Sequence, residues 1–206
     1  NALGFSRQTS AILNHASIHL QNNTKNIYCE KPLNYIRYND VDEIDGLPNF
    51  NKRLIKEFYT YKMDSVVRQQ DLLSNGTQST SNIFAQGSDL FDTFREFLIS
   101  ESQNYVNAYG QSNDGFISNW PNEFSLNGWL VNIRKGGFLK PHNHPSGWVS
   151  GVYYLQIPKK DDKQEANIKF LLHNNDFPES DEVFPEKEVE ALESRLILFP
   201  SSLYHY

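Results

Sequence analysis

The sequence of 206 residues contains one cysteine, Cys29, and one methionine, Met63. A single cysteine excludes a disulfide within the chain, and such sparing use is typical of proteins from a reducing compartment. No stretch approaches the roughly 18 continuous apolar residues that a transmembrane helix needs. The first 30 residues also lack the basic and apolar regions of a signal peptide. We therefore predict a cytoplasmic protein that has no membrane partner.

Basic residues are fewer than acidic residues. The chain has 19 Lys and Arg against 25 Asp and Glu, which gives a formal net charge of −6 at pH 7. Nonspecific nucleic-acid binding depends on clustered Lys and Arg, so we expect no nucleic-acid partner. Aromatic residues are plentiful, at 14% of the chain, and 38% of all residues are apolar. This composition indicates a globular protein whose core is rich in β-structure.

Two histidines stand one residue apart, between Pro141 and Pro145. Alternate side chains of a strand face the same way, so the imidazoles of His142 and His144 can point together from positions roughly 6 to 7 Å apart. His205 ends another strand-like run far along the chain. Any one histidine is more often a surface or core residue than a ligand. A close pair with a distant strand histidine is, however, typical of a metal site, and we predict one at these three residues.

The other histidines fit a metal site less well. His15 and His19 have helical i,i+4 spacing, but Ala16 stands where a zinc-protease helix would carry glutamate. We interpret this pair as one face of a surface helix. His173 ends a strand-like run, residues 166–173, and is a weaker candidate for a ligand.

The hydrophobic period changes along the chain from helical to alternating. Helices are expected over residues 6–21, after a cap at Asn51, and from a cap at Ser88 to Gly110. The segment 31–36 is expected to be extended. Alternating apolar residues predict strands at 129–134, 168–172 and 195–199.

Short strands separated by Gly, Pro and Asn favour a sandwich or jelly roll, so the predicted fold class is mainly β with supporting helices. We divide the chain into an N-terminal helical and linker region, residues 1–50, and a domain of residues 51–206. The acidic segment 175–193 is interpreted as a solvated loop, with a lid over the metal as the alternative.

Two stretches carry a family resemblance. Residues 127–155 run from Asn-Gly-Trp through the histidine pair into Ser150-Gly-Val-Tyr-Tyr154, and residues 198–205 read Leu-Phe-Pro-Ser-Ser-Leu-Tyr-His. Together they resemble the 2-oxoglutarate and Fe(II)-dependent oxygenases. The resemblance implies a double-stranded β-helix, which is a jelly roll backed by helices. It also implies a dioxygenase with Fe(II) as cofactor and 2-oxoglutarate as cosubstrate, which hydroxylates a small molecule or a protein side chain.

The resemblance also assigns ligands. It puts His142, His144 and His205 at the three iron-ligand positions. The wider superfamily most often has a carboxylate where His144 stands, in a site of two histidines and one carboxylate. This departure leaves three interpretations open: a three-histidine iron site, a two-histidine site with a ligand from elsewhere, or a different metal.

The resemblance also implies a cosubstrate position. Tyr154 resembles the strand tyrosine that hydrogen-bonds the 2-oxoglutarate carboxylate. Trp148 stands beside the metal motif and is expected to border the substrate pocket, with a packing residue as the alternative. In the superfamily an arginine about ten residues beyond the last histidine usually pairs with the far carboxylate of 2-oxoglutarate. Here that position would fall after Tyr206.

Two other functions remain open. The spacing Gly136-x5-His-x-His is close to the first motif of the cupins, which include metal dioxygenases and isomerases that do not use 2-oxoglutarate. A cupin places a glutamate shortly after its histidine pair, and residues 145–150 contain no acid, so the oxygenase is favoured. The third possibility is a noncatalytic, metal-stabilised binding module.

Overall fold

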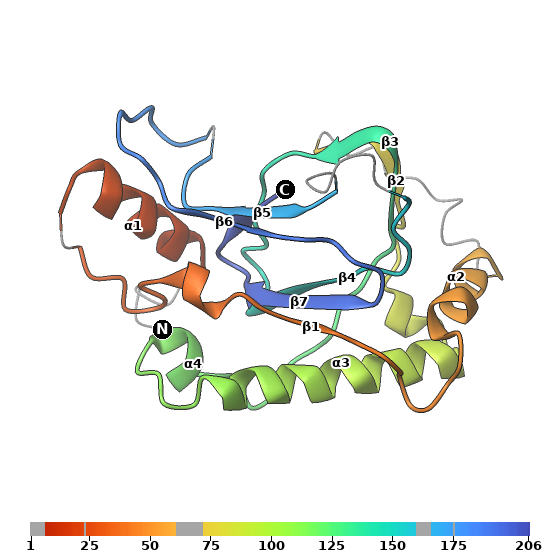
Figure 1. Cartoon of the computed structure of the whole chain (residues 1–206). Coiled ribbons are helices and arrows are strands. Elements are labelled where there is room, and N and C mark those ends of the chain that lie inside the picture. Colours follow the sequence, from red (N-terminus) through yellow and green to blue (C-terminus); the bar gives the residue numbers. More distant parts are fainter. Residues whose placement is uncertain (1–6, 23, 61–71, 160–165, 175) are drawn as a thin grey trace. The chain divides into compact units, whose positions relative to one another are not determined.

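The computed structural model describes residues 7–22, 24–60, 72–159, 166–174 and 176–206 (Figure 1). The chain divides into two compact units, and each is described by itself. The first comprises Asn1–Asn39, Tyr105–Trp120 and Pro141–Tyr206, and the second comprises Asp40–Asn104 and Pro121–Lys140. All the histidines predicted to bind metal belong to the first unit. The domain boundary expected at residue 50 stays a prediction.

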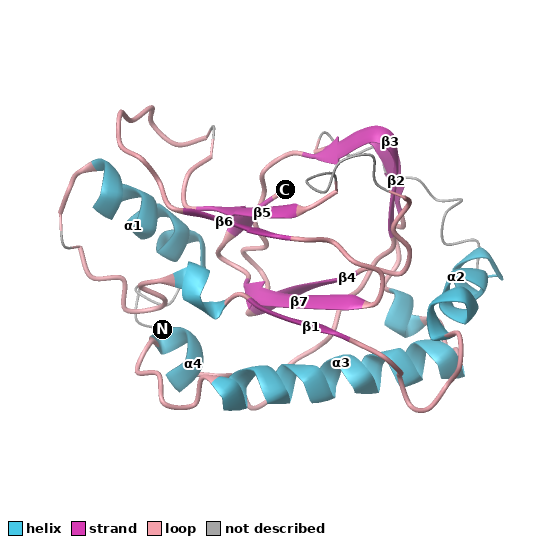
Figure 2. Cartoon of the chain, viewed as in Figure 1, coloured by secondary structure: helices cyan, strands magenta, loops and turns pink. Residues whose placement is uncertain are grey.

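The first unit contains two three-stranded sheets, with strand orders β1-β7-β4 and β6-β5-β8 (Figure 2). β7 pairs antiparallel with β4, and β5 pairs antiparallel with both β6 and β8. The strands are β1 (Arg37–Asp40, whose last residue is counted in the second unit), β4 (Val149–Tyr153), β5 (Ile168–Leu171), β6 (Glu186–Val189), β7 (Arg195–Pro200) and β8 (Tyr204–His205).

Strand β7 is the buried centre of the first sheet. All six of its residues are buried, so both of its faces are covered. The alternation read from the sequence is therefore not an alternation between core and solvent. A continuous apolar run is what a strand covered on both sides requires.

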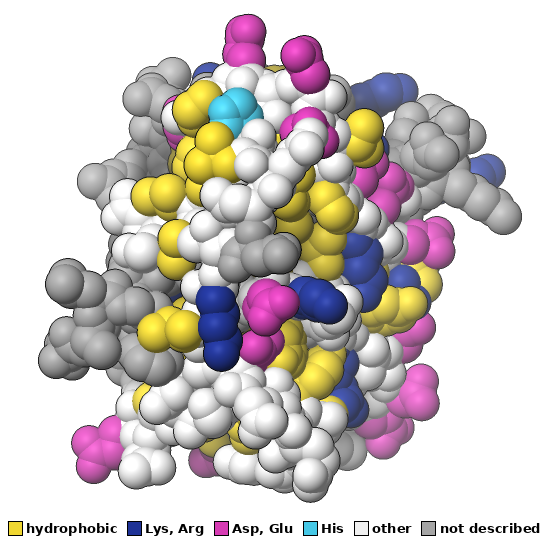
Figure 3. All heavy atoms as spheres, turned by 90° about the vertical axis from the view of Figure 1, so that its left-hand side faces the viewer, with side chains coloured by type: hydrophobic (Ala, Val, Ile, Leu, Met, Phe, Trp, Pro, Cys, Tyr) yellow, Lys and Arg dark blue, Asp and Glu magenta, His cyan; other side chains and the backbone are white. Residues whose placement is uncertain are grey.

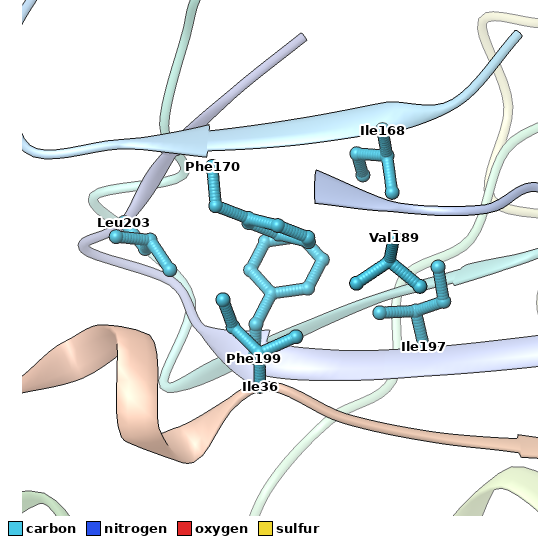
Figure 4. Packing of buried hydrophobic residues seen from close by; sticks show 7 residues of the cluster. All are labelled: Ile36, Ile168, Phe170, Val189, Ile197, Phe199 and Leu203. Carbon is cyan, nitrogen blue, oxygen red and sulfur yellow. The ribbon is translucent and has the colours of Figure 1, made fainter. Parts of the chain in front are cut away.

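Apolar side chains from the two sheets point toward one another and form a core (Figure 4). The rings of Phe170 on β5 and Phe199 on β7 meet edge to face, with centroids 4.8 Å apart. Full burial of such a side chain stabilises a fold by roughly 1.5 to 3 kcal/mol. The core fixes β7 against the sheet that contains β8. Its members are Ile36, Ile168, Phe170, Val189, Ile197, Phe199 and Leu203.

The helices of the first unit are α1 (Arg7–His19), the short 3-10 helix η1 (Pro32–Tyr35) and α4 (Gly115–Ser118). α1 confirms the helix predicted over residues 6–21. The prediction of an extended segment at 31–36 was wrong. Pro32 occupies the first turn of η1, where its fixed φ and missing N–H favour a helical start.

The second unit contains α2 (Phe50–Thr60), η2 (Ile83–Ala85), α3 (Asp89–Ala108) as far as residue 104, and a two-stranded antiparallel sheet of β2 (Leu73–Gln78) and β3 (Val131–Leu139). The helix expected after Ser88 is confirmed. Asn51 lies inside the first turn of α2, so the prediction of a cap there was wrong. The Ser88 hydroxyl donates to the carboxylate of Glu57.

The described residues form sheets together with four helices, and about 30% of the chain is helical against 24% in strands. The expectation of a mainly β chain therefore holds for the region around the histidines but overstates the strand content of the whole. Helices were underestimated because short helical stretches such as α4 and η1 carry no clear period. None of the described helices combines the length and the apolar character needed to cross a membrane.

Candidate metal centre

The backbone brings the first and last of the predicted ligands together. His142 and His205 form an isolated antiparallel β-bridge. The N–H of His142 donates to the carbonyl of His205 at 3.0 Å, and the N–H of His205 donates to the carbonyl of His142 at 2.9 Å. Side chains of directly opposed residues lie on the same face of a ladder. The bridge therefore sets two imidazoles side by side.

His144 is fixed by the turn between β7 and β8. Its N–H donates to the carbonyl of Ser201 at 3.0 Å, and the N–H of Ser201 donates to the carbonyl of Trp148 at 3.2 Å. Between the two histidines, the Asn143 side chain donates to the carbonyl of Ser202 at 3.4 Å. The segment that carries the histidine pair is thus bonded along its length to the segment that ends in His205.

The three imidazoles form one group. Each offers a ring nitrogen, and these nitrogens all lie within 4.8 Å of one another. The ring centroids of His142 and His205 are 4.4 Å apart, and the ring of His144 lies 5.1 Å from the first and 5.2 Å from the second. The group contains no carboxylate. Three imidazoles suit iron, zinc, copper or nickel, whereas magnesium and calcium prefer oxygen ligands.

Burial keeps the imidazoles of His144 and His205 neutral. His205 is only 5% exposed, and the rings of Phe199 and Phe170 lie 4.7 Å and 6.2 Å from its own. Burial, followed by the charges of His142 and His144, lowers the pKa of His205 to about 3. Burial, followed by the charge of His142, lowers the pKa of His144 to about 4. Only a neutral imidazole has a lone pair for a metal, so both residues can act as ligands at neutral pH.

A backbone carbonyl selects the tautomer of His205. Its Nδ1 lies 3.2 Å from the carbonyl oxygen of Leu203, which can only accept. Nδ1 must therefore carry the proton when this bond forms, and Nε2 keeps its lone pair. Metal-bound histidines commonly donate their second ring nitrogen to a carbonyl in this way.

Gly147 permits the close approach of the two segments. A Cβ at this position would lie 2.6 Å from Ser201 Oγ, and Ser201 is fully buried with its hydroxyl 2.7 Å from that of Ser150. We expect Gly147→Ala to destabilise the fold by about 1 to 3 kcal/mol and to weaken metal binding, because the turns must separate. Denaturant unfolding and metal titration measure both effects. Gly110→Ala is the matched control, since its nearest contact is 3.5 Å; equal losses in the two variants would contradict the role of Gly147.

The backbone of Tyr154 pairs with the end of β7 opposite to the one that bonds His144. Its N–H donates to the carbonyl of Arg195, at the other end of β7 from Ser201. At about 3.3 Å per residue, these ends are roughly 20 Å apart. The Tyr154 side chain packs against the core, and burial raises the pKa of its hydroxyl. The cosubstrate role of Tyr154 stays a prediction.

Trp148 is half-buried and has packing partners of its own. Its indole Nε1 donates to the carbonyl of Phe116 at 3.0 Å, and its ring meets Tyr28 edge to face at 5.3 Å. These contacts tie the segment that follows the histidine pair to α4. A place at the border of a substrate pocket remains a prediction.

The remaining histidines form a second cluster, composed of His15, His19 and His173. His15 is only 3% exposed, and its Nδ1 lies 3.3 Å from Nδ1 of His173. Phe177 and Phe184 stack on the His15 ring at 4.5 and 4.9 Å. The interpretation of His15 as a surface residue was therefore wrong. Figure 3 views the side on which α1 lies and shows one histidine among hydrophobic side chains at the surface. His173 belongs to this cluster and not to the predicted metal group.

Several residues that support the predicted site were not found from the sequence. Ser201 and Leu203 act through backbone carbonyls, which every residue type possesses. Arg7 donates to the loop after the histidine pair from far along the chain. Neither kind of contact leaves a local signal in the sequence.

Comparison with known proteins supports the resemblance over one segment. Residues 127–206 match the model of a family described as putative 2OG-Fe(II) oxygenase. The matched segment contains all three clustered histidines and the strands β4 to β8. A comparison with curated proteins gives no match. Residues 127–206 of this chain are thus similar to the 2OG-Fe(II) oxygenase family.

Proposed function

We propose that the chain is an Fe(II)- and 2-oxoglutarate-dependent dioxygenase in which His142, His144 and His205 hold the metal. The observation that carries the proposal is the grouping of their ring nitrogens within 4.8 Å, inside the segment that matches the oxygenase family. Bound there, Fe(II) would supply the binding of 2-oxoglutarate and the activation of O2 for hydroxylation. Three protein ligands leave positions on the metal for both of these molecules.

The proposed roles of the surrounding residues follow from their contacts. The three histidines bind the metal in their neutral form. The Leu203 carbonyl orients the His205 ring through Nδ1. Phe170 and Phe199 cover the inner side of that ring and exclude water from it. Exclusion of water protects a reactive metal centre from side reactions.

We further propose that the first unit carries the double-stranded β-helix of the family. Its two sheets pack face to face over one core, and β4 to β8 all lie within the matched segment. The oxygenase domain would then combine these strands with α1 and α4 of the same unit.

The charge of the site bears on the cosubstrate. Three neutral imidazoles leave the full charge of Fe(II) in place, whereas a carboxylate ligand would offset one unit of it. An anionic chelator such as 2-oxoglutarate can supply the missing negative charge. We therefore expect 2-oxoglutarate to strengthen Fe(II) binding.

An anaerobic titration tests the proposed function. The protein loaded with Fe(II) should develop a weak visible charge-transfer band when 2-oxoglutarate is added, and Fe(II) should bind more tightly in its presence. The matched control is succinate, which lacks the 2-oxo group that completes the chelate. Metal binding with no response to 2-oxoglutarate would contradict the oxygenase and favour a cupin-type enzyme or a noncatalytic module.

A further inference from the structure

Helix α1 contacts the loop that follows the histidine pair. Arg7 Nε donates to the carbonyl of Pro145 at 3.0 Å, and Arg7 Nη2 donates to the carbonyl of Ser146 at 3.3 Å. The guanidinium carbon also lies 5.9 Å from the ring centroid of Trp148, within the range of a cation–π contact. One side chain thus bonds two successive carbonyls and covers the neighbouring aromatic ring.

These two carbonyls belong to the turn that begins at His144. The N–H of Gly147 donates to the carbonyl of His144 at 2.9 Å, which closes a four-residue turn with Pro145 in its second position. The carbonyls of the two central residues of such a turn take no part in its own hydrogen bond. Arg7 therefore restrains the two central residues of the turn through their carbonyls. The hydrogen bond from the His144 N–H to the Ser201 carbonyl restrains its first residue.

Buried hydrogen bonds hold α1, the helix that begins with Arg7, in place. The buried Asn26 side chain donates to the carbonyl and hydroxyl oxygens of Ser10 at 3.0 and 2.9 Å and to the side chain of Asn14 at 2.8 Å. Asn14 in turn donates to the carbonyl of Cys29 at 3.2 Å. Buried networks with their partners satisfied hold elements in one arrangement. The helix is therefore fixed to the chain segment that leads to Tyr28, which itself packs on Trp148.

Arginine is well suited to bind the two adjacent carbonyls of Pro145 and Ser146. α1 has no acidic residue in its first turn that could pair with Arg7. A cation at this end opposes the helix dipole, so Arg7 does not stabilise the helix. Its planar guanidinium presents several donors in a fixed geometry, which matches two adjacent carbonyls. A lysine has a single charged nitrogen on a flexible stem and would hold the pair less well.

We propose that Arg7 is a positioning residue for His144, and that α1 is a working part of the metal site. The inference rests on the proposed metal function. When Arg7 is lost, the turn gains freedom, the His144 ring leaves its place beside His142 and His205 more often, and the metal dissociates faster. Loss of a group that supports a ligand commonly lowers metal affinity by 10- to 100-fold. Because Arg7 is partly exposed, we expect the lower end, about tenfold.

The test is Co(II) binding measured by chelator competition, together with the visible spectrum of bound Co(II), for the unaltered chain and for Arg7→Gln, Arg7→Lys and Lys25→Gln. Lys25 is exposed and belongs to the same unit, so Lys25→Gln controls for the lost charge. We expect Arg7→Gln to lose about tenfold in affinity, Arg7→Lys to lose less, and Lys25→Gln to match the unaltered chain. The Co(II) spectrum should keep its shape in Arg7→Lys, because the ligands do not change.

Several outcomes would overturn the proposal. Unchanged affinity in Arg7→Gln, or an equal loss in Lys25→Gln, would remove the positioning role while the metal site stands. If Arg7→Gln does not fold, Arg7→Lys decides in its place, and full affinity in that variant overturns the role. Absence of Co(II) binding in the unaltered chain would overturn the proposed metal function and this inference with it.

Discussion

Alanine at position 142, 144 or 205 is expected to lower metal affinity about a hundredfold in each case. Structural zinc sites with four ligands contribute roughly 10 to 16 kcal/mol, so one ligand is worth on the order of 3 kcal/mol. The ring nitrogens of the three histidines lie within 4.8 Å of one another, so the loss of any one opens the same chelate. Metal titration of each purified variant with Fe(II) under anaerobic conditions measures the effect.

Two further variants sharpen this prediction. His173→Ala removes a histidine from the second cluster and should leave metal affinity unchanged. His144→Asp supplies the carboxylate that the wider superfamily most often carries, and it should bind metal more tightly than His144→Ala. Normal metal content in His144→Ala would exclude that residue as a ligand. A loss in His173→Ala as large as in His142→Ala would mean that the two clusters share one metal.

Acid is expected to destabilise the metal-free protein strongly between pH 6.5 and pH 3. The pKa of His205 is about 3 in the folded chain and near 6.5 in the unfolded chain, where burial no longer acts. Between these values the unfolded state binds more protons, so the free energy of unfolding falls as the pH falls. At 1.36 kcal/mol per pH unit, His205 alone contributes roughly 4 kcal/mol to this loss. His144, with a pKa of about 4, acts in the same direction.

Denaturant unfolding at a series of pH values tests this expectation. His205→Leu removes the titrating group but keeps an apolar side chain against Phe170 and Phe199, so its stability should depend less on pH whatever its absolute value. Lys25→Gln, an exposed substitution in the same unit, is the control and should keep the slope of the unaltered chain. An identical slope in His205→Leu would show that His205 is not buried in its neutral form.

The sequence was sufficient to pick out the three histidines of the candidate site. The spacing of His142 and His144 is local, and His205 ends a strand pattern that the structure contains as β7 and β8. The pairing that joins His142 to His205 could not be predicted, because the register of distant strands depends on the whole core. The same limit applies to Arg7, whose partners lie on a loop distant in sequence.

Two expectations from the sequence fail for physical reasons. His15 has the spacing of a surface helix residue, but Phe177 and Phe184 from a distant segment cover it. Asn51 is a good capping residue by type, yet α2 begins at Phe50. At His15, contacts with a distant segment outweigh the local pattern. At Asn51, the helix starts one residue earlier than the capping preference predicts. Such contacts are not encoded in hydrophobic periodicity.

The most direct test of the account is an anomalous diffraction measurement at the iron edge on crystals of the protein loaded anaerobically with Fe(II). We expect one strong peak, within bonding distance of a ring nitrogen of each of His142, His144 and His205, with Nδ1 of His205 turned to the Leu203 carbonyl. A peak at His15 and His173 instead, or no ordered iron between the three residues, would contradict it.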